Sequence, residues 1–368
     1  MAMEALVLCL VISMQTALVP VAAGGLHRPP AMYVLGDSLL DVGNNNYLPG
    51  ADVRRANRPY YGIDFPGGVP TGRFSNGFNL ADYVAKTMGF ASSPPPYLSL
   101  LGGQLAVPAA LTKGVSYASA DAGILDSTNA GKCIPLSRQV HYFNATRAEM
   151  VTTVGSSAVS HLLSKSIFLI GVGINDLLVF SRAQNKSAAE QQSDAAALYA
   201  DLISNYSATI KELYSMGARK FAFNNAFQIG CTPNARLLDA AGQCDGSVNQ
   251  LAVGFNDALR SMLAGLATRL PGFVYSLADA FGLSGDVFAR PLAYGFTDIA
   301  DACCGSGRLL AEGSCLPNST LCTNRDDYVF WDRSHITQRT SFLSAQAFYD
   351  GPAQYTTPIN FKQLAHSS

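Results

Sequence analysis

The stretch from Met32 to Leu39, MYVLGDSL, decides the fold and contains the first functional candidate. Its four leading apolar residues are typical of a short strand buried on both faces, and Gly36-Asp37-Ser38 ends the run with turn-forming residues. Three further apolar runs share this pattern and predict strands at 166–171, 219–224 and 273–277.

Helical spacing of apolar residues separates these predicted strands. The helices are expected at 78–88, 188–216, 248–270 and 341–349. Strands that alternate with helices indicate an α/β fold, in which a mainly parallel sheet is covered by helices on both faces. Because ligands in such folds bind at the carboxyl ends of the strands, the turns after the first two strands are the expected site.

The composition indicates one large domain. The chain has 368 residues, 48% of them hydrophobic, and no shift in composition marks a boundary, so we expect a single domain over residues 26–360. The 25 Lys and Arg residues balance 26 Asp and Glu, and no run is rich in Lys or Arg. Neither nucleic acid nor an anionic membrane surface is therefore an expected partner.

The N-terminus is typical of a secretory signal peptide over residues 1–23. Residues 5–18 are mostly apolar, and Val21-Ala22-Ala23 offers small residues before a cut near Gly24. The alternative is a retained membrane anchor, but Gln15 and Pro20 interrupt the apolar stretch before it reaches the ~20 residues that span a bilayer. We expect a protein of the secretory pathway, located in the cell wall or outside the cell, or in the Golgi.

Eight cysteines and four glycosylation sequons agree with an oxidising compartment. Seven cysteines remain once Cys9 leaves with the signal, so at least one thiol stays unpaired, and we expect it to be Cys133. The adjacent Cys303 and Cys304 are expected to bond to different partners. No Cys-X2-Cys pair with a nearby histidine exists, so a zinc site is not expected. The sequons begin at Asn144, Asn185, Asn205 and Asn318.

His335 is the candidate general base. Histidine is the commonest proton-transfer residue near neutral pH, and the chain has only five. Asp332 precedes His335 by three residues, a spacing at which the carboxylate can reach the imidazole Nδ1 and stabilise the imidazolium. His27 and His366 lie near the two ends of the chain. His161 lies in a helical stretch and His141 beside aromatic residues without an adjacent acid, which favours structural roles for these two.

Ser38 is the candidate nucleophile, because a serine on a sharp turn after a strand can project its hydroxyl from the sheet edge. A helix N-cap is an equally good local interpretation of this serine. Asn175 follows the second predicted strand and can offer a side-chain N–H to a developing oxyanion, or can bond to its own turn. Since parallel strands bring both turns to one edge, we predict that Ser38, Asn175 and His335 converge there.

These residues stand in motifs that resemble the plant GDSL esterase/lipase family of the SGNH hydrolase superfamily. The resemblance implies a carboxylic ester hydrolase with a three-layer α/β/α sandwich, an acyl-enzyme intermediate and no cofactor. It makes Ser38 the nucleophile, His335 the base and Asp332 its orienter, with the Ser38 N–H and Asn175 as oxyanion donors. The motifs are GDSLLDVGNNN at 36–46, GIND at 173–176 and DRSH at 332–335, in the family order.

The second family block, GVSYASADAG at 114–123, departs from the family pattern. Ala120 and Asp121 stand where the family usually has a glycine. The backbone N–H near Ala120 is expected to be a further oxyanion donor, since every residue except proline carries that group. A carboxylate at Asp121 would oppose the developing negative charge unless it points away from it.

Plant proteins that resemble this chain act on lipids, small acyl esters and acetylated cell-wall polysaccharides. The expected substrate is an O-acetyl ester of cell-wall polysaccharide, because a secreted, glycosylated chain without a basic or amphipathic membrane-binding segment suits a wall substrate better than a bilayer. Four residues of the predicted loops, Tyr60, Tyr61, Arg73 and Trp331, could stack on sugars. Two alternatives remain: a lipase or acyltransferase that acts on lipid or small acyl esters, and a catalytically impaired relative that binds carbohydrate.

Overall fold

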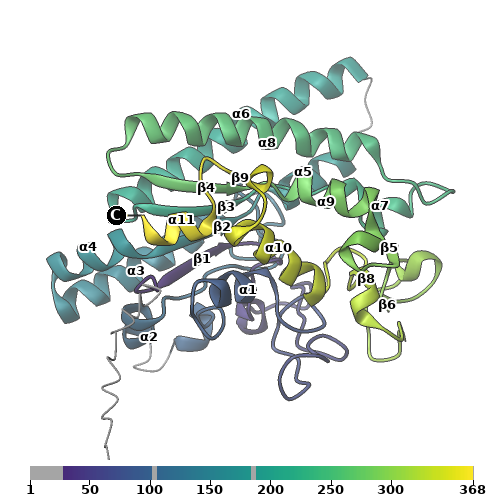
Figure 1. The fold of residues 1–368 in the computed structure, drawn as a ribbon, viewed down its shortest axis with the longest axis horizontal. Coiled ribbons are helices and arrows are strands. Elements are labelled where there is room, and N and C mark those ends of the chain that lie inside the picture. Colours follow the sequence, from purple (N-terminus) through teal and green to yellow (C-terminus); the bar gives the residue numbers. More distant parts are fainter. Residues whose placement is uncertain (1–27, 102–105, 184–187, 368) are drawn as a thin grey trace, which may run out of the picture.

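A five-stranded sheet organises the protein (Figure 1). The computed structural model describes residues 28–101, 106–183 and 188–367. The strand order is β1-β2-β3-β4-β9, with the first four strands parallel and β9 antiparallel. The strands are β1 (Met32–Gly36), β2 (Ile167–Gly171), β3 (Lys220–Asn224), β4 (Val274–Ala278) and β9 (Thr356–Thr357), so all four predicted strands are confirmed.

Helices cover both faces of this sheet. On one face α3, α6 and α8 pack together, whereas α1, α10 and α11 pack on the other, which confirms the three-layer α/β/α sandwich (Figure 1). The predicted helices correspond to α1 (Leu80–Thr87), α6 (Ala188–Ser215), α8 (Gly246–Arg269) and α10 (Gln338–Asp350).

The sequence patterns missed the remaining helices. They are α2 (Ala106–Thr112), α3 (Leu136–Val154), α4 (Ser156–Lys165), α5 (Ile174–Arg182), α7 (Pro233–Arg236), α9 (Ala280–Ala289) and α11 (Phe361–His366). Among the described helices, none is both long enough and apolar enough to cross a membrane.

The strands form the core because they are apolar on both faces. All five residues of β1 are buried, and Tyr33 stacks on Phe168 of β2 with ring centroids 5.0 Å apart. The segment 115–117 lies along the outer edge of β1, since Val34 N donates to Val115 O and Tyr117 N donates to Val34 O. The paired register sets Gly36 opposite Gly171, so both predicted turns begin at the same edge.

Residues 298–337, here called the cysteine-rich segment, lie at this edge with two small sheets of their own. Cys303 is bonded to Cys322 and Cys304 to Cys315, so the adjacent cysteines do have different partners. A third disulfide joins Cys231 to Cys244, and Cys133 is the free thiol, as expected. The small sheets pair β5 (Asp298–Ala302) with β8 (Tyr328–Phe330) and β6 (Cys304–Gly305) with β7 (Thr320–Leu321).

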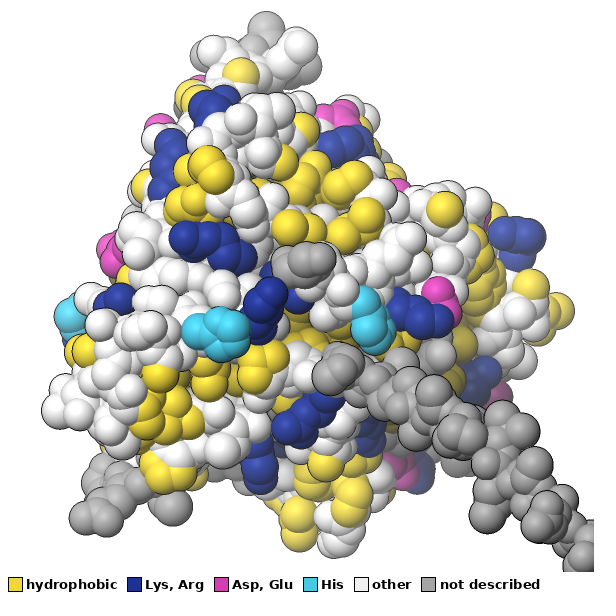
Figure 2. Space-filling view, turned by 60° about the vertical axis from the view of Figure 1, so that its left-hand side comes forward, with side chains coloured by type: hydrophobic (Ala, Val, Ile, Leu, Met, Phe, Trp, Pro, Cys, Tyr) yellow, Lys and Arg dark blue, Asp and Glu magenta, His cyan; other side chains and the backbone are white. Residues whose placement is uncertain are grey.

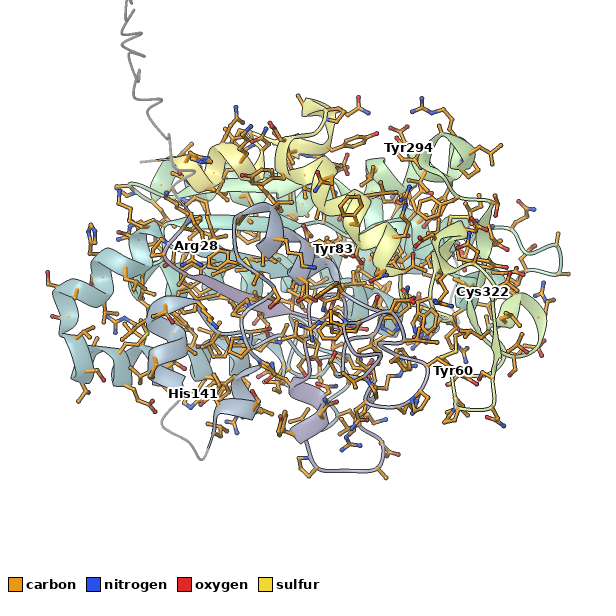
Figure 3. The ribbon with its side chains drawn as sticks, turned by 60° about the horizontal axis from the view of Figure 1, so that its bottom comes forward. Arg28, Tyr60, Tyr83, His141, Tyr294 and Cys322 are labelled. Carbon is orange, nitrogen blue, oxygen red and sulfur yellow. A yellow bond between two sulfur atoms is a disulfide. The ribbon has the colours of Figure 1, made fainter. Side chains whose placement is uncertain are left out.

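A second apolar cluster joins the cysteine-rich segment to the loop at 43–76. Tyr61 packs edge-on against both Phe74 and Trp331, at centroid distances of 5.8 and 6.3 Å. Figure 3 shows Tyr60 and Cys322, which are far apart in the sequence, at the same end of the molecule. The hydroxyl of Tyr60 donates to the Pro317 carbonyl at 2.8 Å, so the two segments are also joined by a hydrogen bond.

Three of the four sequons fall on described surface. Asn144 in α3, Asn205 in α6 and Asn318 in the cysteine-rich segment are all exposed. Asn185 and the signal-peptide segment at 1–23 lie outside the described residues. Glycosylation therefore stays a prediction.

Candidate active site

Ser38 lies on a tight turn directly after β1. The Asp37 carbonyl accepts hydrogen bonds from Leu40 N and Asp41 N, at 3.1 and 2.9 Å, which closes the turn. Gly36 has a φ of 154°, and a Cβ atom there would lie 2.3 Å from the Gly171 carbonyl oxygen. Only glycine therefore allows β1 to run this close to β2 immediately before the turn.

Gln139 of α3 holds the peptide of Gly36 from the side. Its Oε1 accepts from Gly36 N at 2.8 Å, and its Nε2 donates to Gly36 O at 2.9 Å. The side chain is fully buried, so both bonds are made away from water. The sequence analysis missed this residue, because a lone glutamine on an unpredicted helix gives no local signal.

The Asp41 carboxylate ties this turn to the second block of the sequence. It accepts from Gly43 N and Asn44 N at 2.7 Å, and from Ala120 N at 3.0 Å. Burial raises the pKa of Asp41 to about 6, although these backbone N–H groups oppose the shift. The Asp41 carboxylate therefore joins two loops beside Ser38 by hydrogen bonds: the loop that follows Asp41 and the loop that contains Ala120.

Asp332 and His335 form a close pair in the cysteine-rich segment. His335 Nδ1 lies 2.8 Å from both Asp332 carboxylate oxygens, as the three-residue spacing predicts. The carboxylate also accepts from Ser334 N, from His335 N and, at 2.7 Å, from the Tyr61 hydroxyl. Tyr61 is thus an orienting group that sequence reasoning missed.

The electrostatics of this pair favour an ionised carboxylate. Burial acts to raise the pKa of Asp332, but the charge of His335 and the hydrogen bonds from His335, Tyr61 and Ser334 outweigh it. The net result is a pKa well below the usual range of aspartate. An ionised Asp332 can accept a hydrogen bond from Nδ1–H, and this favours the tautomer in which Nε2 is the basic nitrogen.

The structure brings the main predicted residues to one cavity. A cavity of about 290 Å³ is lined by Ser38, Asn175 and His335, together with Asp37 and Asp121. Within the described chain, the Ser38 hydroxyl makes no hydrogen bond, so it is free to turn toward the His335 imidazole, which lines the same cavity. Catalytic hydrogen bonds are often long before substrate binds, so this geometry is compatible with a serine–histidine pair.

Asn175 projects from the N-terminal turn of α5. One of its two Nδ2 protons is used by the Ala122 carbonyl at 3.0 Å, and the other remains available toward the cavity. The neighbouring Asp176 accepts from Ile124 N, Leu125 N and the Thr128 hydroxyl. The two side chains therefore fix the loop after the second block against α5.

The expectation for Ala120 does not fit the structure. Ala120 is buried, does not line the cavity, and its N–H is already donated to the Asp41 carboxylate. The next residue, Asp121, does line the cavity and has a φ of 67°, in the left-handed region that favours glycine. Its N–H makes no hydrogen bond to any residue that the structure describes. Of the two residues, only Asp121 therefore lines the cavity and keeps its backbone N–H unoccupied.

The Asp121 carboxylate has a cation beside it. Arg54 Nη1 lies 3.6 Å from Asp121 Oδ1, and the Asp121 side chain is only 14% exposed. This contact compensates the charge that would otherwise oppose a nearby oxyanion.

Asp37, next to Ser38, is a second buried acid. Burial raises its pKa to about 7, whereas the Leu39 N–H and the positive charge of His335 act to lower it. Its one described side-chain hydrogen bond comes from Leu39 N at 3.0 Å. A titrating carboxyl thus lies in the cavity wall within electrostatic reach of the candidate base.

The predicted sugar-stacking residues are not available as a group. Tyr61 and Trp331 are buried in the second apolar cluster, and Arg73 is buried in an ion pair with Asp82. Tyr60 is half-buried and bonded to Pro317. The expectation of stacking on sugars is therefore wrong for Tyr61 and Trp331, which are buried by packing, and for Arg73, which is buried in its ion pair. For the half-buried Tyr60 it stays a prediction.

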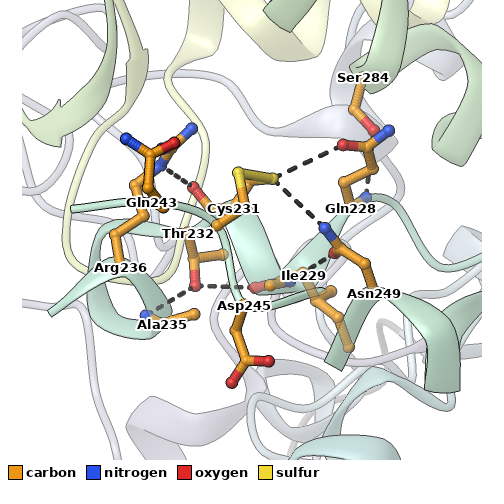
Figure 4. Close-up of a disulfide and its surroundings, with 12 residues drawn as sticks. Gln228, Ile229, Cys231, Thr232, Ala235, Arg236, Gln243, Asp245, Asn249 and Ser284 are labelled. Atoms are coloured by element: carbon orange, nitrogen blue, oxygen red, sulfur yellow. Dashed lines mark hydrogen bonds between the residues drawn. A yellow bond between two sulfur atoms is a disulfide. The ribbon is translucent and has the colours of Figure 1, made fainter. Parts of the chain in front are cut away.

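A further part of the cavity wall is built from α5, from the segment 229–238 and from the start of α8. It combines polar side chains, among them Arg182, Thr232 and Asp245, with a group of apolar ones that we call the apolar wall. The disulfide between Cys231 and Cys244 fixes this wall, and Arg236 Nε and Asn249 Nδ2 donate to the Cys231 carbonyl and sulfur (Figure 4). The apolar wall consists of Ile174, Leu178, Val179, Ile229, Leu238 and Val248.

In the described ranges, no group of three or more His, Cys, Asp or Glu side chains is placed to hold a metal ion.

Comparisons with known proteins agree with this fold. The GDSL-like Lipase/Acylhydrolase family matches residues 32–348, and the chain belongs to this family of carboxylic ester hydrolases. A GDSL esterase/lipase of Arabidopsis thaliana is 38% identical over 351 residues, which cover 93% of this chain and 92% of the relative. A second from the same plant is 36% identical over 344 residues, or 91% of this chain and 85% of the relative. The family prediction is thereby confirmed.

Proposed function

We propose that the chain cleaves carboxylic esters through an acyl-enzyme on Ser38. His335 takes the hydroxyl proton as Ser38 attacks the carbonyl, and the ionised Asp332 stabilises the imidazolium. His335 then protonates the leaving alcohol, and water releases the acid. The observation that carries this proposal is the shared cavity of Ser38 and His335, with Nδ1 of His335 already bonded to Asp332.

Three donors at the cavity suit the oxyanion of the tetrahedral intermediate. They are the Nδ2 of Asn175 and the backbone N–H groups of Ser38 and Asp121. All three residues line the cavity, and neither N–H has another partner in the part of the chain that is described. Removal of one such donor typically lowers kcat by roughly 100- to 1,000-fold.

Replacement of the nucleophile tests the proposal directly. The Ser38→Ala variant should lose ester hydrolysis and labelling by a serine-directed fluorophosphonate, because no acyl-enzyme can form. Its melting temperature should stay close to that of the unchanged protein. Ser164→Ala, on α4 away from the cavity, is the control and should keep full activity. A Ser38→Ala protein that still turns over ester would refute the assignment, and an unchanged protein that never labels would support the impaired relative.

The finer substrate assignment is O-acetyl ester of cell-wall polysaccharide, and we propose it together with secretion through a signal peptide at 1–23. The polar groups around the cavity support it, since they can hydrogen-bond to sugar hydroxyls. The apolar wall supports the alternative, an ester with a longer acyl chain, for which burial contributes about 0.8 kcal/mol per CH₂.

Acyl-chain preference separates these two candidates. We would compare acetate release from acetylated xylan with release from 4-nitrophenyl acetate and 4-nitrophenyl octanoate. A polysaccharide deacetylase should prefer xylan and lose activity as the acyl chain grows, whereas a lipase-like enzyme should prefer octanoate. An added sugar acceptor tests the acyltransferase alternative, because transfer yields an acetylated acceptor in place of free acetate.

A further inference from the structure

A second cavity, rich in arginine, adjoins the reaction cavity. It measures about 450 Å³ and shares Asp52, Arg54, Ser334 and His335 with the reaction cavity. At the other end of the molecule, around α4 and the C-terminus, Lys and Arg side chains are scattered among uncharged and apolar ones (Figure 2). We call this second space the arginine cavity, after Arg54, Arg55, Arg58 and Arg333 in its wall.

The carboxylates in the wall do not neutralise these arginines. Asp332 is engaged by His335 and Tyr61, and the exposed Asp52 forms no ion pair with any described residue. Arg54 faces Asp121 at 3.6 Å, whereas the other three arginines have no carboxylate within ion-pair distance in the described ranges. The arginine cavity therefore carries an excess of positive charge.

Arg58 has unused hydrogen-bond donors. Only its Nε is occupied, by the Cys315 carbonyl at 3.3 Å, and neither terminal nitrogen has a partner among the described residues. Its guanidinium lies 5.8 Å from the Tyr61 ring, which also lines the cavity. The planar fork of donors on arginine matches the two oxygens of a carboxylate or phosphate.

Arg55 and Arg333 are held in place by neutral acceptors. Arg55 donates to the carbonyls of Leu48 and Gly50 and so braces its own loop. Arg333 donates to the side-chain oxygen of Asn234. Burial and the neighbouring Arg54 lower the pKa of Arg333, and the charge of Asp332 opposes this shift only in part.

The position of His335 indicates which part of an ester would enter the arginine cavity. This step rests on the proposed function, in which His335 delivers a proton to the leaving alcohol. The alcohol must then lie beside His335, and the arginine cavity contains His335 and Ser334. The residues of the apolar wall line the reaction cavity alone, so the acyl group is expected there.

We propose that the arginine cavity binds an anionic group, a carboxylate or a phosphate, on the alcohol portion of the ester substrate. Arg58 contacts this group directly, and Arg54 and Arg333 add positive charge around it. The enzyme is thus selective for acidic alcohols over neutral ones, which narrows the substrate class beyond the family's general ester chemistry.

Matched acetate esters test this selectivity in the full chain. The substrates are 4-acetoxybenzoate, its neutral methyl ester and 4-acetoxyphenyl phosphate, each followed by acetate release. The unchanged enzyme should prefer at least one anionic ester over the methyl ester, and the preference should weaken in high salt. Arg58→Gln should reduce the ratio of kcat/KM for the preferred anionic ester to that for the methyl ester by about 10-fold, the size expected for one charge-assisted hydrogen bond.

The controls separate the subsite from the reaction itself. Arg269→Gln, an exposed arginine at the far end of α8, should leave the ratio unchanged, and Arg58→Lys should restore part of it. Inorganic phosphate should inhibit methyl-ester hydrolysis less in Arg58→Gln than in the unchanged enzyme. If Arg58→Gln lowered kcat/KM equally for anionic and neutral esters, so that the ratio between them stayed unchanged, the proposed anion subsite would be wrong. Failure of the unchanged enzyme to cleave any of the three esters would count against the proposed function instead.

Discussion

The two halves of the candidate site are held in place by different kinds of structure. Ser38 follows β1, the first strand of the main sheet, whose position is set by parallel pairing with β2 and by the segment 115–117 along its outer edge. Asp332 and His335 lie in the cysteine-rich segment, where the sheets are short and two disulfides link neighbouring strands and loops.

This difference shows two ways to fix a reactive side chain. At the Ser38 turn, a buried sheet edge and the polar side chains of Gln139 and Asp41 determine the backbone. In the cysteine-rich segment, covalent links and the Tyr61 hydroxyl replace the missing sheet. We therefore expect mutations at the Ser38 turn to act through hydrogen bonds and charge, and mutations in the cysteine-rich segment to act through chain entropy.

The largest effect is expected at Asp332. In Asp332→Asn, the amide can present an N–H to His335 Nδ1, which favours the wrong imidazole tautomer. We expect kcat to fall by about 1,000- to 10,000-fold, with a much smaller change in melting temperature. Asp326→Asn, an exposed acid in the same segment, should have near-normal kinetics. Comparable kinetics for both variants would show that the carboxylate of Asp332 does not act through His335.

Removal of a disulfide should affect the cysteine-rich segment next most strongly. Cys304→Ser combined with Cys315→Ser opens a loop closed over 11 residues and should lower the free energy of unfolding by about 3 kcal/mol. Cys133→Ser is the matched control, because that thiol is free. Denaturant unfolding measures both. Equal losses in the two proteins would mean that the covalent link does not stabilise this segment.

The Ser38 turn should respond to pH through Asp37. Its pKa in the folded protein, about 7, exceeds the value of 3.8 that is usual for an aspartate in an unfolded chain. Its contribution to stability is therefore present below pH 3.8 and is lost as the pH rises toward 7. Asp37→Asn keeps an acceptor for Leu39 N and removes the charge. We expect the variant to gain about 2 kcal/mol over the unchanged protein at pH 8 and little at pH 3.5. Unfolding at the two pH values tests this, and a gain that does not vary with pH would contradict it.

The smallest effect is expected at Asp121. Asp121→Gly removes a left-handed, non-glycine residue and a carboxylate near the oxyanion donors, so stability should rise by about 0.5–1 kcal/mol and kcat by a few-fold. Asp121→Ala also removes the charge but retains a Cβ, and should gain activity without the gain in stability. Thermal unfolding and ester kinetics distinguish the two. A fall in kcat in both variants would mean that the carboxylate helps the reaction.

The sequence alone determined the strands, the main helices and the candidate residues. Continuous apolar runs such as Met32–Leu35 can only be satisfied in a sheet covered on both faces, and the turn residues after them mark the edge where ligands bind. The three-residue spacing of Asp332 and His335 was a local signal, because both groups lie within one turn of chain.

The sequence did not predict which distant segments come into contact, and only the tertiary structure shows these contacts. No local pattern shows that Tyr61 bonds to Asp332, that Gln139 holds Gly36, or that the Ala120 N–H is already taken by Asp41. The same limit explains the wrong prediction for Tyr61 and Trp331. Their local sequence suggests loops that are open to sugars, but packing against distant segments buries both side chains. The chemistry of the side chains and their local spacing follow directly from the sequence. Burial and hydrogen-bond partners depend instead on which distant segments meet once the sheet has formed.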